Sequence, residues 1–233
     1  MSVADGLNQF LFGVYPYICM AVFLFASLIR FDRDQFTWKS DSSQLLRAHE
    51  LRWGSNLFHF GVLFIFVGHL FGLLTPHWAY AWLISAAHKQ LLAMVSGGIA
   101  GAVAIVGLSL LIHRRIADPR ISSNTRPWDM AILVILWVQL ALGFLTIAFS
   151  TGHLDGGLMQ RMGLWAQRTV TFRPDAALYL TDVPWPYKTH IVLGLTIFLI
   201  FPFTRLVHIW SGFAAVAYLF RPYQLVRTRK RIA

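Results

Sequence analysis

Four of the nine histidines lie inside long apolar runs of the sequence, where an ionisable side chain is costly to bury. His59 and His69 are ten residues apart in one run, and His190 and His208 are eighteen residues apart in another. A neutral imidazole is a common metal ligand, and it can also form a hydrogen bond between helices. The types and spacing of these residues therefore point either to metal binding in pairs or to interhelical hydrogen bonding.

The composition of the chain indicates whether these histidines lie in water or in a lipid bilayer. Of the 233 residues, 57% are hydrophobic and 13% are charged, whereas an ordinary soluble domain has about 25% charged residues. The chain is therefore expected to be an integral membrane protein. Cys19 is the one cysteine, which excludes an intrachain disulfide, a four-thiolate cluster and the C-x-x-C-H motif of covalent haem, so any haem must be bound non-covalently. The net charge of +10 is expected to orient the chain in the membrane rather than to bind nucleic acid.

Five apolar segments are long enough, at about 1.5 Å per residue, to cross a hydrocarbon core of about 30 Å. They are residues 8–30, 53–74, 91–113, 128–149 and 188–212. The first has no basic residue before it and is followed by Arg30, Arg33 and Lys39, so it is expected to remain as a helix rather than be cleaved as a signal peptide. We predict an all-α membrane protein with one domain, 1–233, that ends in a basic tail, 213–233.

The distribution of Lys and Arg among the connections predicts the orientation of the chain, because cytoplasmic loops carry the excess of basic residues. The N-terminus is accordingly expected to be periplasmic and the C-terminus cytoplasmic. Fifteen basic residues lie on the predicted cytoplasmic side: Arg30, Arg33, Lys39, Arg47, Arg52, Arg114, Arg115, Arg120, Arg126, Arg205, Arg221, Arg227, Arg229, Lys230 and Arg231. Five lie on the other side: Lys89, Arg161, Arg168, Arg173 and Lys188.

The second and fifth predicted spans cross the membrane in opposite directions, so their histidines form two pairs by depth. His59 and His208 lie towards the cytoplasm, and His69 and His190 lie towards the outside. At about 100° per residue, His190 and His208 point the same way, whereas His59 and His69 are about 80° apart on one broad helix face. The axial separations do not match, because they are about 15 Å on the second span and about 27 Å on the fifth. Helix tilt, inclined haem planes or a kink at Pro202 could reduce this difference.

Two imidazoles on opposite faces of one iron form the ligation typical of electron-transfer haems. Four histidines paired by depth on antiparallel helices therefore favour two haems b stacked across the membrane. Zinc fits less well, because no Cys, Asp or Glu accompanies the histidines. The expected iron ligands are His59, His69, His190 and His208. Nearby glycines could admit a flat macrocycle or serve helix packing: Gly61, Gly68, Gly72 and Gly194.

Several basic residues lie where they could serve these sites. Arg114 and Arg115 follow the third predicted span, and Arg205 lies one turn before His208. Their guanidinium groups could pair with haem propionates, or they could act only as orientation signals. Lys89 is the only basic residue between the second and third spans, and it could bind a ligand there or extend to lipid headgroups.

The connection between the fourth and fifth predicted spans contains a candidate interfacial helix. In "GLMQRMGLWAQRTV" the apolar residues gather on one helical face, although a plain loop would also fit. The later "DVPWPYKTH" contains two prolines, which prevent a helix from continuing into the fifth span. The residues of the apolar face are Leu158, Met159, Met162, Trp165, Ala166 and Thr169.

Several stretches of the sequence resemble one family of membrane cytochromes. They are "YPYICMAVFLFASLIRFDRDQFTWKSDSSQLL", "SNLFHFGVLFIFVGHLFGLLTPHW", "HKQLLAM", "THIVLGLTIFLIFPFTRLVHIWS" and "YQLVRTR". They are similar to the gamma subunit of respiratory membrane-bound nitrate reductase, the di-haem cytochrome b that feeds electrons to iron–sulfur and molybdenum subunits. The resemblance covers nearly the whole chain, is most specific in the second and fifth spans, and weakens in the connection between the fourth and fifth spans.

This resemblance implies a role for each matching position. The haem nearer the cytoplasm would be bound by His59 and His208, and the distal haem by His69 and His190, as the depths of these residues also indicate. The family oxidises quinol beside the distal haem, and Lys89 matches a lysine implicated in quinol binding. Electrons from the quinone pool would then pass inward to an iron–sulfur beta subunit and on to a molybdenum alpha subunit, which reduces nitrate. The chain is thus expected in the bacterial inner membrane.

Two alternatives remain open from the sequence alone. A gamma-like cytochrome b could serve another quinone-linked complex, of the sulfite-reduction or heterodisulfide type. A haem-free transporter could instead use the histidines to relay protons, although the repeated halves typical of many transporters are not apparent. The basic tail "RPYQLVRTRKRIA" could dock an acidic partner subunit or attract anionic lipid.

Overall fold

The computed structural model describes residues 3–34 and 48–211, and these residues form helices joined by turns, with no strand among them. The predicted basic tail, 213–233, lies outside the described residues. The α-helices are α1 (Val3–Gln9), α2 (Tyr15–Asp34), α3 (Ala48–Leu74), α4 (His77–Tyr80), α5 (Ala86–Ala117), α6 (Pro119–Ser123), α7 (Pro127–Ser150), α8 (Gly157–Val170) and α9 (Trp185–Ile200). Shorter segments are the π-helix η1 (Phe10–Val14) and the 3-10 helices η3 (Ala176–Leu180), η4 (Phe201–Phe203) and η5 (Arg205–Val207).

Five helical segments in the described part of the chain are long and apolar enough to cross a membrane. The all-α membrane fold predicted from the sequence is therefore confirmed. The segments are Val3–Arg33, His49–Leu74, Ala86–Ala117, Pro127–Ser150 and Trp185–Phe203. Which ends face the cytoplasm stays a prediction.

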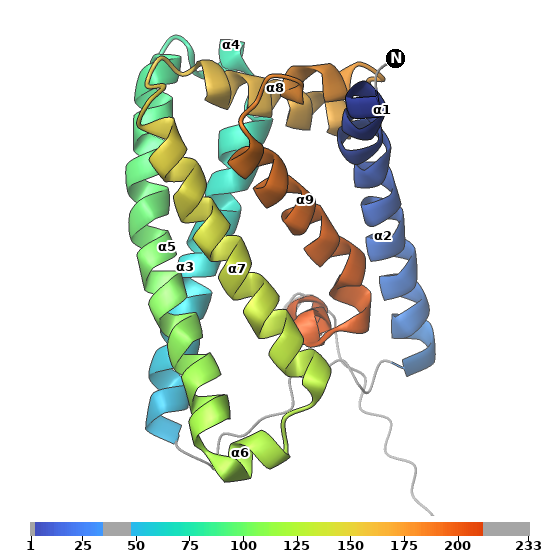
Figure 1. Ribbon diagram of the computed structural model, residues 1–233, viewed down its shortest axis with the longest axis vertical. Helices are drawn as coiled ribbons and strands as arrows, with labels where there is room; N and C mark the ends of the chain where they lie inside the picture. The colour runs from blue at the N-terminus through green and yellow to red at the C-terminus, as the bar shows by residue number, and fades with distance from the viewer. Residues whose placement is uncertain (1–2, 35–47, 212–233) are drawn as a thin grey trace, which may run out of the picture.

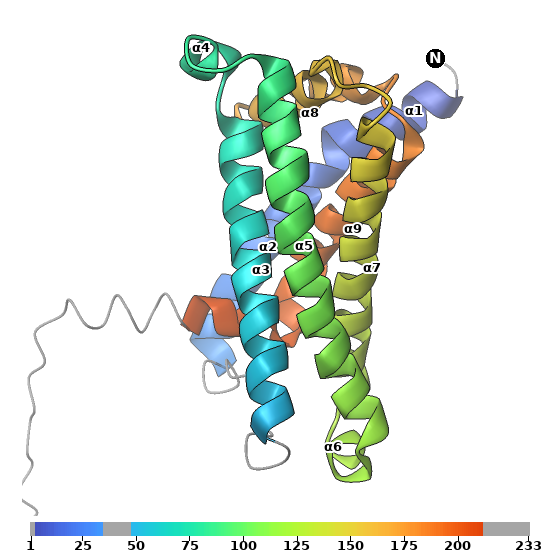
Figure 2. The same ribbon diagram turned by 90° about the vertical axis from the view of Figure 1, so that its left-hand side faces the viewer.

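The long helices form a bundle in which α3 and α5 run side by side along most of their length (Figures 1 and 2). Glycines allow this close approach. A Cβ atom on Gly61 would lie 2.6 Å from the carbonyl oxygen of Ala100, and one on Gly107 would lie 2.4 Å from the backbone nitrogen of Phe58. Small residues at such crossings let two membrane helices pack backbone to backbone. Gly61 thus serves helix packing, one of the two roles expected for it.

Helix α8 lies across one end of the bundle, at the same end as α1 (Figure 1). A helix therefore forms where the sequence predicts one, and its place in the membrane interface stays a prediction. Its apolar face packs against protein, because Trp165 and Ala166 join Phe12 and η3 in a buried cluster. The indole Nε1–H of Trp165 also donates to the carbonyl oxygen of Phe12 at 3.0 Å. These contacts tie the outer connection to the first span.

The fifth span is not the single helix that was predicted over 188–212. Helix α9 ends at Ile200, and η4 and η5 continue the chain as two 3-10 turns before a last helical turn begins at His208. Pro202 has no backbone N–H to continue the hydrogen-bond ladder, and Thr204 is extended, with φ −115° and ψ 176°. The chain therefore leaves the axis of α9 at this break (Figure 1).

Candidate functional site: two histidine pairs

The outer pair consists of His69 on α3 and His190 on α9. The centroids of their imidazole rings are 6.2 Å apart, and the ring planes are inclined by 33°. The Nδ1–H of His69 donates to the carbonyl oxygen of Ile65 at 2.8 Å. Because a carbonyl oxygen only accepts, this contact assigns the proton to Nδ1 and leaves Nε2 of His69 unprotonated.

The inner pair consists of His59 on α3 and His208, which follows η5. Their ring centroids are also 6.2 Å apart, but the planes are inclined by 77°. Both rings use Nδ1–H in the same way. His59 donates to the carbonyl oxygen of Ser55 at 2.7 Å, and His208 donates to that of Arg205 at 2.7 Å. Nε2 is therefore left unprotonated in each ring of this pair.

The break in α9 explains how both pairs form despite the mismatch in axial separation. On a continuous helix, eighteen residues would separate His190 and His208 by about 27 Å along the axis, while His59 and His69 are only about 15 Å apart. The chain leaves the helix axis at Ile200 instead, and the turns η4 and η5 bring His208 beside His59. The structure thus brings together the same partners that the sequence paired by depth.

The geometry of both pairs fits an iron held between two imidazoles. Two metal–nitrogen bonds of about 2 Å, plus about 1 Å from each nitrogen to its ring centre, place the ring centroids about 6 Å apart. A metal-bound histidine usually donates its other ring N–H to a carbonyl oxygen or carboxylate, as three of these rings do. Within the described residues no three His, Cys, Asp or Glu side chains gather around one point. Two protein ligands per site suit a macrocycle that supplies the other ligands better than they suit zinc.

His190 differs from the other three because it has a side-chain neighbour on α7. The Nε2 atom of Gln139 lies 3.4 Å from Nε2 of His190 and donates to the carbonyl oxygen of His190 at 3.1 Å. The Nδ1 atom of His190 is buried without a hydrogen-bond partner. Gly143 lies below the ring, where an added Cβ would be 3.4 Å from Cε1 of His190. Sequence reasoning missed Gln139, because only the packing of α7 on α9 places it here.

The predicted propionate partners lie at the end of the bundle that holds the inner pair. Arg114, at the end of α5, is 1% exposed. Arg114 and Arg205 both lie close enough to Arg115 for their positive charges to repel its guanidinium. The guanidinium of Arg115 donates to the hydroxyl oxygen of Thr125 at 3.1 Å. Arg205 contacts the site through its backbone carbonyl oxygen, which accepts from His208. A role for these arginines towards propionates stays a prediction.

Lys89 lies near the start of α5 with its ammonium group over an aromatic ring. Its Nζ atom is 3.8 Å from the centroid of the Tyr80 ring, a distance typical of a cation–π contact. Burial raises the pKa of the Tyr80 hydroxyl above its ordinary value, so this group stays protonated at neutral pH. The sequence shows no signal for this pairing, because Tyr80 belongs to the short helix α4 in the connection that returns the chain to α5.

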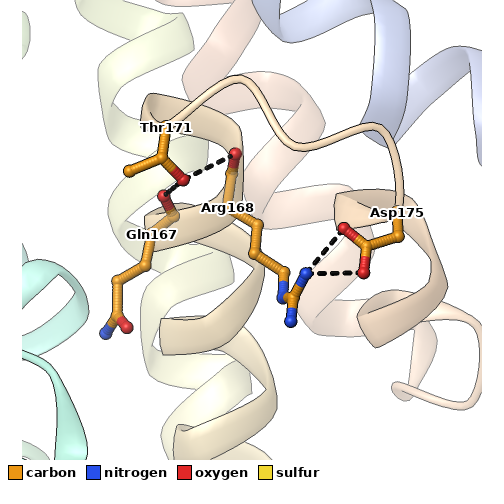
Figure 3. Close-up of polar contacts among 4 residues, drawn as sticks. All are labelled: Gln167, Arg168, Thr171 and Asp175. Carbon is orange, nitrogen blue, oxygen red and sulfur yellow. Dashed lines mark hydrogen bonds and ion pairs between the residues drawn. The ribbon is translucent and has the colours of Figure 1, made fainter.

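Polar side chains near the end of α8 contact both the end of α3 and the start of η3. Gln167 donates through Nε2 to the carbonyl oxygens of Leu73 and Thr75, at 2.9 and 3.3 Å, and so caps the end of α3. Arg168 donates to both carboxylate oxygens of Asp175, at 2.7 and 2.5 Å (Figure 3). This hydrogen bonding raises the pKa of Arg168, whose guanidinium therefore remains charged. These contacts hold the connection between α8 and η3 in place above the outer pair.

The sequence matches one protein family over nearly its whole length. Residues 8–229 match the family described as nitrate reductase gamma subunit. The respiratory nitrate reductase 1 gamma chain of Escherichia coli (strain K12) is 49% identical over 223 residues, which cover 96% of this chain and 98% of that protein. The nitrate reductase gamma chain of Bacillus subtilis (strain 168) is 36% identical over 223 residues, which cover 95% and 99%. The matched region includes both histidine pairs.

Proposed function

The chain belongs to the nitrate reductase gamma subunit family, and from this premise we propose that it is the quinol-oxidising di-haem cytochrome b subunit that anchors a respiratory nitrate reductase to the membrane. It is a multi-pass protein of the bacterial inner membrane. The observation that carries the proposal is the equal 6.2 Å ring separation of two histidine pairs on antiparallel segments. It matches the separation of about 6 Å expected when two imidazoles bind one metal ion from opposite sides.

The protein residues would bind and orient the two groups. His69 and His190 would hold the outer haem, and His59 and His208 would hold the inner one. The carbonyl oxygens that accept from the Nδ1–H groups fix the ring tautomer and increase the basicity of the coordinating nitrogen. When bound, haem b supplies reversible one-electron transfer, so that electrons from quinol can reach an acceptor on the opposite side of the membrane.

We place quinol oxidation beside the outer pair. Lys89 is held by the Tyr80 ring at the end of the bundle where α3 turns into α5, and its ammonium group could donate to a quinol oxygen. Protons released there would enter the periplasm if the predicted orientation is correct. Each electron that crosses inward then moves charge against a potential worth about 2.3 kcal/mol per 100 mV. The subunit would thereby contribute to the membrane potential.

The proposal includes an iron–sulfur beta subunit that accepts electrons from the inner haem, and a molybdenum alpha subunit that reduces nitrate. Among the described residues, no group of three potential metal ligands could hold a further redox centre. Electrons delivered to the inner pair therefore need a partner protein. The tail 213–233, which was expected to contribute to docking, lies outside the described residues. Nitrate itself would not contact this chain.

The two alternatives make different predictions. A cytochrome of a sulfite-reduction or heterodisulfide-type complex would bind both haems but would not pass electrons to nitrate. A transporter would contain no haem. Among these, the names of the full-length relatives favour the nitrate reductase assignment.

The test is a haem count and a nitrate assay on the assembled complex in its membrane. Wild type is expected to contain two haems b per chain, both reducible by quinol and reoxidised by nitrate. His69→Ala should retain one haem and lose quinol oxidation, whereas His49→Ala, on the same helix but outside both pairs, should resemble wild type. A wild-type chain that is correctly inserted but colourless would exclude the proposal. Two haems that are not reoxidised by nitrate would favour the first alternative.

A further inference from the structure

The break at the end of α9 leaves backbone carbonyl groups that cannot be satisfied within a helix. The last carbonyls of a helix have no N–H partners of their own, and Pro202 removes another donor from the chain that follows. Pro202 is buried and Thr204 is 8% exposed, whereas the side chain of Phe203 between them points outward. Buried backbone carbonyls of this kind need a donor from elsewhere in the protein.

Arg30, near the end of α2, supplies that donor. Its Nη1 donates to the carbonyl oxygen of Pro202 at 2.6 Å and to that of Thr204 at 3.2 Å. One guanidinium nitrogen thus bridges the two ends of the turn at which the chain leaves α9. Hydrogen bonds from a charged donor are about twice as strong as neutral ones, and a setting of low dielectric constant strengthens them further.

The turn held by Arg30 leads directly to the inner pair. Thr204 accepts through its hydroxyl oxygen from the backbone N–H of Leu206 at 3.3 Å, which starts η5. The carbonyl oxygen of the next residue after Thr204, Arg205, then accepts from Nδ1 of His208 at 2.7 Å. Arg30 is therefore connected, through the short backbone segment 204–208, to the imidazole ring that faces His59. His190, in contrast, lies within α9 before the break.

We propose that Arg30 is a positioning residue for the inner haem: by clamping the broken end of α9, it sets the place and orientation of His208. This inference rests on the proposed function, because it concerns a ligand of the inner haem. It gives Arg30 a role that the sequence did not indicate, since there Arg30 counted only as one of the basic residues that orient the chain.

The test compares substitutions at two arginines of α2 in the full complex. Arg30→Met removes the donor, and Arg30→Lys retains the positive charge on a side chain that ends one bond short of the position of Nη1. Arg33→Met and Arg33→Lys are matched controls, because Arg33 is exposed three residues further along the same helix. The readouts are the haem content, the redox potential of each haem and its low-spin ferric EPR signal.

Arg30→Met is expected to lose the inner haem and keep the outer one, which halves the haem content. Arg30→Lys should keep both haems but shift the potential and the EPR signal of the inner one alone. Thr204→Val, which removes the hydroxyl cap of η5, should shift the same signals by less. Both Arg33 variants should match wild type.

The outcomes also separate this inference from the proposed function. If wild type contains two haems and Arg30→Lys leaves both signals unchanged, Arg30 acts only as an orientation charge and the inference is wrong. If the Arg30 variants affect the two haems equally, or remove both, the clamp is not specific to His208 and the inference is also wrong. If wild type itself lacks haem, the proposed function fails instead.

Discussion

The outer and inner histidine pairs reach the same ring separation in different ways. His69 and His190 both belong to regular helices, and their ring planes are inclined by 33°. In the inner pair, His59 belongs to the same regular helix, but His208 follows two 3-10 turns and the inclination is 77°. The comparison shows that two regular helices packed together can supply one pair, whereas the other pair needs a break in one helix, which residues distant in sequence hold in place.

Removing one ligand from each pair should have the largest effect. His190→Ala is expected to lose the outer haem and quinol oxidation, because the proposed function has electrons enter beside that pair. His208→Ala should lose the inner haem but leave the outer haem reducible by quinol, with transfer to the partner subunits blocked. A pyridine haemochrome count, together with the absorption change on adding quinol, measures both. If either variant removes both haems, the two sites do not form independently.

The close packing of α3 on α5 offers a second way to separate the two sites. An alanine at Gly107 would place its Cβ 2.4 Å from the backbone nitrogen of Phe58 and 2.8 Å from the carbonyl oxygen of Gly54. Such overpacking costs about 1–3 kcal/mol, and here it would displace α3 next to His59. We expect Gly107→Ala to release the inner haem at a lower temperature than wild type while the outer haem is retained longer.

Gly97, on the same helix, gives the matched control for this substitution. A Cβ at this position meets no atom within 4 Å, so Gly97→Ala should leave both haems unchanged or gain up to about 1 kcal/mol from helix propensity. Thermal release followed by visible absorption measures all three proteins. Equal effects of the two substitutions would mean that the α3–α5 contact does not position His59.

The contact between Lys89 and Tyr80 lies at the end of the bundle that is nearer the outer histidine pair. Tyr80→Leu removes the aromatic ring and should weaken quinol binding about two- to fivefold, which corresponds to a cation–π contact of about 0.5–1 kcal/mol. Tyr80→Phe keeps the ring and should resemble wild type, with the same pH dependence, because the raised pKa of Tyr80 keeps its hydroxyl neutral. The KM for quinol and both haem potentials are measured. A shift in the inner haem potential would contradict this local role.

The difference in ring inclination should be visible without any substitution. Two imidazole planes inclined by 33° perturb the iron dπ orbitals unequally, whereas planes inclined by 77° perturb them almost equally. Near-equal orbital energies increase the orbital contribution to the magnetic moment. We therefore expect the inner haem to give the larger low-field g value in the ferric EPR spectrum, with His208→Ala used to assign the signals. The reverse assignment would show that the rings reorient around the metal.

The sequence predicted the spans, the amphipathic α8 and the pairing of histidines by depth, because these features depend on local properties. The length of an apolar run, the 100° step of a helix and the alternating direction of successive spans all follow from the order of residues. The same reasoning left a difference of about 12 Å between the two axial separations unexplained. Pro202 marked a weak point in the fifth span, but a proline alone does not specify the direction that the chain takes after it.

Only the tertiary structure decided how the inner pair forms and which residues surround each pair. The Arg30 contacts with Pro202 and Thr204 join residues 172 and 174 positions apart, and the contact of Gln139 with His190 joins residues 51 positions apart. Such contacts depend on how whole helices pack, and no local pattern encodes them. The sequence by itself therefore predicted which histidines form each pair, and the packing of α2, α7 and α9 determined how they are held.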